Sequence, residues 1–289
     1  MLSKIKILIV SLVSISGFLF LSPEENYVSR LRVLRNENDD DYSSRPVIHT
    51  FYQQSDVGEE DLLKSWADSW QEVGFQTRVL TLEDAKKHPN FDEYSKIIFE
   101  NAWDDYNQMC FYRWLAMAST GDGGWMTDYD TFPLNFPIEE GRVLPNNGQF
   151  TSFEIFVPSL MSGSAEEWKR VTKMVIDAID HIPEDTPKTD MFAFREVSRQ
   201  DDNGIQFLRP DIPDPEIRRG YDYISPHEVN CDAMKFARAV HLSHSKSAAA
   251  FNDGLYPIEI ENAREQYRSD ASRVYLREWK EQCSSSASS

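Results

Sequence analysis

Two aspartates, Asp128 and Asp130, follow directly after the short apolar stretch of residues 125–127. Side chains two positions apart in an extended strand point to the same face, so both carboxylates at the end of this strand can reach one cation. Hard divalent ions such as Mg²⁺ and Mn²⁺ favour carboxylate oxygens and bridge to the phosphate oxygens of a substrate. A metal held there would neutralise a diphosphate leaving group. The spacing alone is not specific, because a solvated acidic turn has the same pattern.

The charge of the chain excludes one class of partner and fits another. Its 289 residues include 48 acidic and 30 basic ones, for a formal net charge of -18. A nucleic-acid-binding protein usually shows a basic patch and none is visible, so we expect no nucleic-acid partner. An acidic protein binds an anionic small molecule through local arginines or a bound metal ion. The hydrophobic content of 40% and aromatic content of 12% indicate a folded chain with a sizeable core.

The chain contains three cysteines, Cys110, Cys231 and Cys283. An odd number leaves at least one free thiol or an intermolecular bond. Cys231 and Cys283 are a candidate disulfide pair, which the sequence alone does not establish. There is no C-x-x-C spacing, so we do not expect a zinc ribbon or a thioredoxin-like site.

Residues 1–22 have the pattern of a signal peptide or a signal anchor. Lys4 and Lys6 precede the apolar run of residues 7–21, which is about the length of a signal-peptide core and shorter than a typical membrane-spanning helix. No A-x-A cleavage site follows this run. Both alternatives therefore remain: a signal peptide that is cleaved and a signal anchor that is not. Either form predicts the secretory pathway, as a type II protein of the Golgi lumen held to the membrane by this segment or as a secreted protein. A buried N-terminal helix is the alternative.

The rest of the chain divides into a linker, one domain and a short tail. Residues 23–45 are polar and charged, which predicts a stem. We expect the folded domain over residues 46–282 and a Ser-rich tail over residues 283–289.

The order of predicted elements indicates an α/β domain. Residues 46–52 and 75–80 are rich in β-branched and aromatic residues and predict strands, and an apolar stripe between them predicts a helix that ends at Gly74. This succession predicts a βαβ unit and a parallel sheet. Trp66, Trp70 and Trp168 fall on helical stripes and predict core packing. The patterns also predict helices over 91–101, 104–118, 165–179, 190–200 and 261–281 and strands over 125–127, 148–157 and 159–161, with Ser164 as an N-cap.

The surroundings of the two aspartates carry a family resemblance. An arginine, Arg113, stands on a predicted helix; Gly123 and Gly124 follow, then the apolar strand and the D-x-D pair. This arrangement resembles the DXD-containing glycosyltransferases related to the fungal initiating α-1,6-mannosyltransferases, glycosyltransferase family 32. The resemblance is best over residues 105–134, with weaker similarity over residues 47–244.

The resemblance implies a single domain of the GT-A fold, a Rossmann-like nucleotide-diphospho-sugar transferase. It implies a divalent metal cofactor, Mn²⁺ or alternatively Mg²⁺, and a nucleotide-sugar donor. The implied reaction moves a hexose to a glycan or glycoconjugate acceptor with retention of anomeric configuration.

The resemblance also assigns roles to residues. His49 would lie in the first strand, whose end borders the nucleotide, although a structural role at a strand end is the other interpretation. Arg113 would contact the donor, and Asp128 and Asp130 would hold the metal, with Asp128 also binding the donor. The glycine pair would let the backbone turn tightly before the strand, among the donor-binding residues. One departure is Cys110, which stands where many relatives have an aspartate that holds donor sugar hydroxyls, so the donor sugar stays open.

Two further positions are candidates for chemistry. Asp190 opens a predicted helix and, by the resemblance, would be a catalytic residue that faces the acceptor or the reacting carbon; an aspartate at a helix start is also a common N-cap. His241 and His244 are three residues apart, and enzymes of this fold often supply a late histidine as a third metal ligand. We favour His241, because it follows the apolar pair of residues 239–240 directly; a surface or core position is the alternative.

Two other functions compete with a sugar transferase. A glycoside hydrolase uses two acids about 5 to 10 Å apart on opposite sides of the glycosidic bond. Two acids at i and i+2 after a Gly-Gly turn fit shared metal binding better. A secreted glycan-binding protein that uses no sugar nucleotide is the third hypothesis.

Overall fold

The computed structural model describes residues 44–53, 59–207, 217–219, 224–225, 228–229, 231, 237–243 and 266–283. The chain separates into two units, residues 1–35 and residues 36–289, and every described residue belongs to the second. The predicted signal segment and nearly all of the predicted stem therefore lie outside the described residues. Within the described part of the chain, no helix is both long enough and apolar enough to cross a membrane.

The central element of the described fold is a mixed sheet, with strands in the order β2-β1-β3-β6-β5-β7. Strand β1 pairs in parallel with β2 and with β3, so that His49 lies between Arg78 and Met126, whereas β6 runs antiparallel to β3. The predicted βαβ unit and parallel pairing are thus confirmed, and the domain is α/β. The bounds of the strands are Val47–Phe51 (β1), Gln76–Leu80 (β2), Gly123–Thr127 (β3), Thr151–Ser152 (β5), Leu160–Ser164 (β6) and Gln206–Phe207 (β7).

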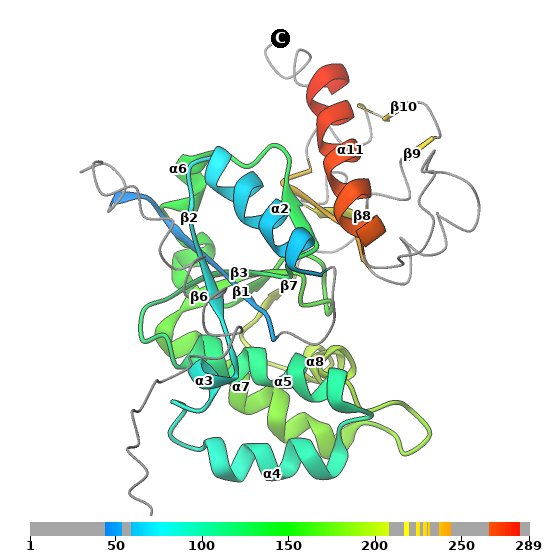
Figure 1. The fold of residues 1–289 in the computed structure, drawn as a ribbon. Helices are drawn as coiled ribbons and strands as arrows, with labels where there is room; N and C mark the ends of the chain where they lie inside the picture. The colour runs from blue at the N-terminus through cyan, green and yellow to red at the C-terminus, as the bar shows by residue number, and fades with distance from the viewer. Residues whose placement is uncertain are drawn as a thin grey trace, which may run out of the picture. The chain divides into compact units, whose positions relative to one another are not determined.

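Helices lie on both sides of this sheet (Figure 1). On one side, helix α2 buries the predicted stripe, including Trp66 and Trp70, and ends before Gly74, whose φ of 101° suits the stop. Helix α11 packs on α2, with contacts between Ser65 and Ser269. The described helices are α2 (Glu59–Glu72) and α11 (Gln266–Cys283) on this side, and α3 (Leu82–Ala85), α4 (Phe91–Asn101), α5 (Asp105–Ala118), α7 (Ala165–Asp177) and α8 (Asp190–Ser198) on the other.

An aromatic cluster joins the helices of the second side to the sheet. The ring of Trp114 on α5 contacts Phe150, Trp168 and Phe194, at centroid distances of 6.0, 6.0 and 5.1 Å. Helix α7, which carries Trp168, begins at the predicted N-cap Ser164, whose side chain accepts from the backbone of Glu167. The buried tryptophans on predicted stripes are therefore core residues, as expected.

A second, three-stranded sheet has the order β4-β11-β8, and its first strand interrupts the large sheet along the chain, between β3 and β5. Its strands are Thr131–Pro133 (β4), Ala239–His241 (β11) and Ile217–Arg219 (β8), and β11 pairs antiparallel to β4 so that His241 lies opposite Thr131. Since β3 ends at Thr127 and β4 begins at Thr131, residues 128–130 alone separate these two strands of different sheets. A separate hairpin joins β9 (Ile224–Ser225) to β10 (Glu228–Val229).

The strand predicted over residues 148–157 is wrong in most of its length. The segment contains only the two residues of β5, after the 3-10 helix η2 (Pro145–Gly148) and before a turn. Within this segment Gly148 and Ile155 have φ angles of 80° and 50°, outside the β region of regular strands. The remaining short elements are α6 (Ile138–Gly141) and the 3-10 helix η3 (Ala178–His181).

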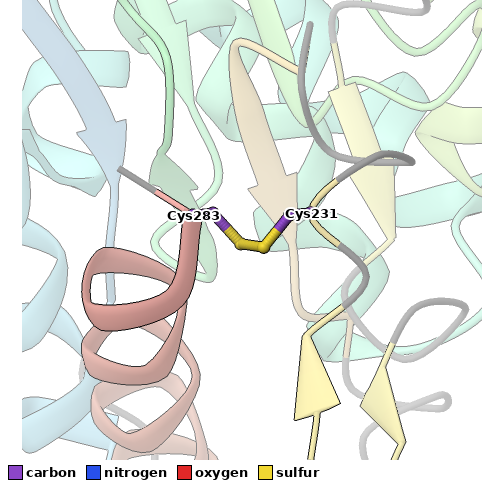
Figure 2. The surroundings of a disulfide bond; sticks show 2 residues. All are labelled: Cys231 and Cys283. Carbon is purple, nitrogen blue, oxygen red and sulfur yellow. A yellow bond between two sulfur atoms is a disulfide. The ribbon is translucent and has the colours of Figure 1, made fainter. Parts of the chain in front are cut away.

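The predicted start of the tail at residue 283 needs correction by one residue. Cys283 ends α11 and forms a disulfide with Cys231, with the two Cα atoms 5.2 Å apart (Figure 2). The candidate pairing is confirmed, and the folded domain extends to Cys283. Helix α11 begins at Gln266, later than the predicted start at residue 261, and residues 261–265 lie outside the described residues.

Candidate metal centre

The turn Asp128-Tyr129-Asp130 lies at the carboxyl ends of the parallel strands β1 and β3. The chain leaves β1 for β2 on one side and later returns to β3 on the other, so this edge is a topological switch point. Ligands of open α/β sheets bind outside the carboxyl ends of strands at such points. Backbone hydrogen bonds fix the turn: Asp128 donates to Ser159, Thr131 donates to Asp128, and Leu242 donates to Asp130, at 2.9, 3.0 and 2.9 Å.

Three predicted metal ligands meet at this turn. Asp128, Asp130 and His241 each offer a ligand atom, and these atoms all lie within 4.8 Å of one another. Nε2 of His241 is 3.4 Å from Oδ1 of Asp130. His241 reaches the turn because β11 pairs with β4, the strand that follows Asp130. The preference for His241 over His244 is supported by this position, and His244 lies outside the described residues.

Glu154 completes this cluster and was not predicted from the sequence. Its Oε2 lies 2.8 Å from Nδ1 of His241 and also accepts from the hydroxyl of Ser159 at 2.6 Å. A carboxylate on one ring nitrogen orients the other nitrogen toward a metal, as in many metal sites. Burial lowers the pKa of His241, but Glu154 and Asp130 raise it more, to well above its ordinary value.

The turn that carries Glu154 explains why local sequence patterns did not predict its role. Ile155, the next residue, adopts a φ of 50°, which is strained for a β-branched side chain, and its carbonyl accepts from the hydroxyl of Ser152. Such a conformation is imposed by surrounding contacts and has no local pattern. A single acid between two apolar residues was the one available hint.

Arg113 bridges two carboxylates on opposite sides of the site. Its Nη1 donates to Asp128, and its Nε and Nη2 donate to Oδ2 of Asp190, the former at 2.9 Å. The guanidinium is buried, so these charge-assisted bonds are stronger than they would be in water. The arginine predicted to contact a donor therefore also organises the acidic residues around it.

Asp190 is not the N-cap of α8. That position belongs to Thr189, whose hydroxyl accepts from the backbone of Phe192 at 3.2 Å. The side chain of Asp190 turns into the protein instead, where it also accepts from the indole nitrogen of Trp114 at 3.0 Å. This places the residue predicted as catalytic beside Arg113, within the same charged network.

Opposing influences act on the pKa of the Asp128 carboxylate. Burial raises its pKa to about 6; Arg113 acts in the opposite direction, while Asp130 contributes to the increase. A divalent cation between the two aspartates would favour their charged forms, since it adds positive charge where two negative charges lie close together.

Two tryptophans of α2 hold the residues on either side of the turn. The indole nitrogen of Trp66 donates to the hydroxyl of Thr127 at 2.8 Å, and that of Trp70 donates to the carbonyl of Thr131 at 3.0 Å. The two rings are four residues apart and so lie on one face of the helix. Both tryptophans pack in the core, as the sequence predicted. Each also holds one residue that flanks the turn Asp128-Tyr129-Asp130.

His49 is built into the middle of the sheet. Its exposed fraction is 3%, its Nδ1 donates to the carbonyl of Trp125 at 3.0 Å, and burial lowers its pKa to about 4. Tyr52, at the end of β1, is the side chain that this strand brings to the motif: its ring contacts that of Tyr129 with centroids 5.6 Å apart. These contacts support a structural role for His49. The residue lies within the strand and not at its end, where it was predicted.

Gly123 and Gly124 lie at the start of β3, at the opposite end from Asp128. Their φ angles are 70° and 110°, and a Cβ on Gly123 would lie 2.4 Å from the backbone nitrogen of Ala165. Five residues of strand span roughly 16 Å. Both glycines belong to β3 itself, where they pair with Ser164 and Gly163, so they do not form the tight turn predicted before the strand. The structure brings neither glycine to the carboxylates.

Comparison with known proteins gives a family match. A family model described as Domain of unknown function (DUF8765) matches residues 40–203, more than half of the chain. The match includes Arg113, the aspartate pair, Glu154 and Asp190, and ends before His241. No curated protein matches the chain.

Proposed function

The chain belongs to the family Domain of unknown function (DUF8765), and we propose that it is a metal-dependent glycosyltransferase of the GT-A type. In this proposal it moves a hexose from a nucleotide-sugar donor to a glycan or glycoconjugate acceptor, with retention. The observation that carries the proposal is the convergence of Asp128, Asp130 and His241 at the carboxyl edge of the sheet, beside Arg113.

The residues of the cluster fit a divalent metal of intermediate hardness. Two carboxylates suit Mg²⁺ and Mn²⁺, while an imidazole ligand is less suited to Mg²⁺, so the mixed set favours Mn²⁺. Glu154 supplies the outer carboxylate that orients His241. When bound, the metal would neutralise charge on a diphosphate leaving group.

The other residues of the network have separate roles in the proposal. Arg113 holds Asp128 and Asp190 in place and adds a positive charge where a diphosphate would lie. Asp190, fixed by Arg113 and Trp114, faces the reacting groups. Tyr129, partly exposed and packed edge-to-face on the buried ring of Tyr52, offers aromatic surface at the switch point, where a nucleotide would bind.

The topology around the turn supports the GT-A proposal. A parallel βαβ unit precedes the D-x-D turn, and the turn leads from the large sheet into a small one, whose strand β11 returns a histidine to the metal site. The late histidine and the D-x-D pair were expected from the resemblance to family 32 glycosyltransferases.

We place the protein in the secretory pathway, as a type II membrane protein of the Golgi lumen or as a secreted protein. The disulfide between Cys231 and Cys283 supports this, because disulfides form and persist in oxidising compartments. The apolar run of residues 7–21 supplies the entry signal.

The proposal is tested by screening nucleotide sugars for Mn²⁺-dependent hydrolysis and transfer, using residues 24–289. We expect one donor to be hydrolysed with Mn²⁺ and none with a chelator. Asp128→Asn and Asp130→Asn should each lower this activity by roughly a thousandfold while the circular dichroism spectrum stays unchanged.

Two results would overturn the assignment. Full activity in either aspartate variant would exclude the metal mechanism. Glycan cleavage that survives the chelator, with no use of any nucleotide sugar, would identify a glycoside hydrolase instead.

A further inference from the structure

Two large aromatic side chains stand exposed where α5 begins: Trp103 on the segment after α4, and Tyr106 in the first turn of α5. Trp103 is 68% exposed and Tyr106 is 67% exposed. The chain has seven tryptophans, all of which the structure describes, and the other six are buried. Single exposed apolar side chains are common, so the position of these two rings relative to the candidate metal centre carries the argument.

Tyr106 is connected to the candidate metal centre along one face of α5. Tyr106, Cys110 and Arg113 are spaced four and three residues apart, so their side chains follow one helical face. Cys110 follows Tyr106 on α5 by about one helical turn. Tyr106 and Arg113 are separated by about 10 Å along the helix axis, at 1.5 Å for each residue. That distance is on the order of the length of two linked sugar rings.

Trp103 is connected to the other side of the same site. Its backbone nitrogen donates to the carbonyl of Lys188 at 3.1 Å, and the ammonium of Lys188 donates to Asn101 at 2.8 Å. Lys188 precedes Asp190 by two residues. The segment with the exposed rings is therefore fixed against the loop that delivers Asp190 and lies beside the charged network.

The chemistry around the rings selects among partners. Asp104 and Asp105 lie between them and are exposed, and Asn107 follows, held by a hydrogen bond to Asp104 at 2.7 Å. Adjacent carboxylates disfavour a nucleic acid or an anionic membrane. Flat aromatic rings with carboxylate and amide neighbours match a pyranose, whose apolar C–H face packs on a ring while its hydroxyls need hydrogen-bond partners.

We propose that Trp103 and Tyr106 form a platform that binds a pyranose ring of the acceptor glycan. The identification of this glycan as the acceptor rests on the proposed transferase function. The platform itself rests on the geometry of residues 101–108. The rings would hold the acceptor one to two sugar units away from Arg113 and Asp190, with its terminal hydroxyl directed to the site.

The test uses the exposure of Trp103 as a probe. Acrylamide quenches exposed tryptophans, so the readily quenched part of the fluorescence of residues 24–289 should come from Trp103. Without metal or donor, we expect at least one neutral oligosaccharide, from a panel ending in mannose, glucose, galactose or N-acetylglucosamine at up to 10 mM, to protect this fraction. Trp103→Phe should abolish the fluorescence signal but retain binding in calorimetry.

Two further variants separate the platform from a general effect on the fold. Trp103→Ala and Tyr106→Ala should each weaken glycan binding by roughly three- to tenfold. They should also raise KM for the acceptor while KM for the nucleotide sugar stays unchanged. Val143→Ala removes another exposed apolar side chain, on a different segment, and should change neither quantity.

The outcomes distinguish this proposal from the proposed function. Failure of the whole panel to protect Trp103, or unchanged binding in both alanine variants, would overturn the platform even if Mn²⁺-dependent transfer is found. Protection of Trp103 in a protein that hydrolyses no nucleotide sugar would support the platform and overturn the transferase.

Discussion

The two ends of strand β3 are built for different purposes. At its start, Gly123 allows the backbone of β3 to approach that of residues 163–165 more closely than a side chain permits, and Gly124 has a φ of 110° that suits glycine. At its end, Asp128 and Asp130 lie among Arg113, His241 and other polar groups that satisfy charge. The first end is constrained by space and the second by electrostatics. Substitutions should therefore affect stability at the glycine end and metal binding at the carboxylate end.

The largest effect on stability is expected from Gly123→Ala. The new Cβ would lie 2.4 Å from the nitrogen of Ala165, at a φ of 70°, so the strand or α7 must shift. We expect a loss of about 3 kcal/mol or more in the free energy of unfolding, measured with urea. Gly121→Ala is the matched control, because its φ is 83° and no atom lies within 4 Å; it should cost about 1 kcal/mol. Equal losses would refute the close-approach argument.

A smaller effect on stability is expected from His49 on β1, which donates to the carbonyl of Trp125 in the middle of β3. Since burial lowers the pKa of His49 to about 4, the unfolded chain binds a proton that the folded protein does not. This contribution to stability is fully present above pH 6.5 and is lost as the pH falls toward 4, for a total of about 3 kcal/mol. His49→Gln should reduce the loss of stability between pH 7 and pH 4.5 by about 2 kcal/mol. The same pH dependence in both proteins would contradict a neutral, buried His49.

The smallest effects, and the sharpest comparison, come from two tryptophans at opposite ends of the strand. Trp66 donates to Thr127 before the carboxylates, and Trp168 donates to the carbonyl of Gly124 at 3.1 Å. Both are fully buried, so Trp66→Phe and Trp168→Phe should each cost about 1 to 2 kcal/mol in urea unfolding. Calorimetric titration with Mn²⁺ should show binding about tenfold weaker in Trp66→Phe alone. Equal Mn²⁺ affinity in the two variants would show that Trp66 only packs the core.

Local patterns in the sequence predicted most of the elements that surround β3. The stripe of α2, the strand propensity of β1 and β2, and the N-cap of α7 are short-range features, and each agrees with the structure. The strand expected over residues 148–157 failed because its turn depends on strained backbone, Ile155 above all, that distant contacts impose. Propensity describes a residue and its near neighbours, and it does not include such contacts.

The sequence by itself determined the chemistry available to this protein. It supplies a D-x-D pair after a buried strand, an arginine on the preceding helix, and a glycine pair at the start of that strand. Only the tertiary structure decided which distant residues join them. Pairing of β11 with β4 brings His241 to Asp130, a strained turn brings Glu154 to His241, and the start of α8 brings Asp190 to Arg113. These contacts join residues far apart in sequence, and their geometry follows from strand register and helix packing, which no local pattern encodes.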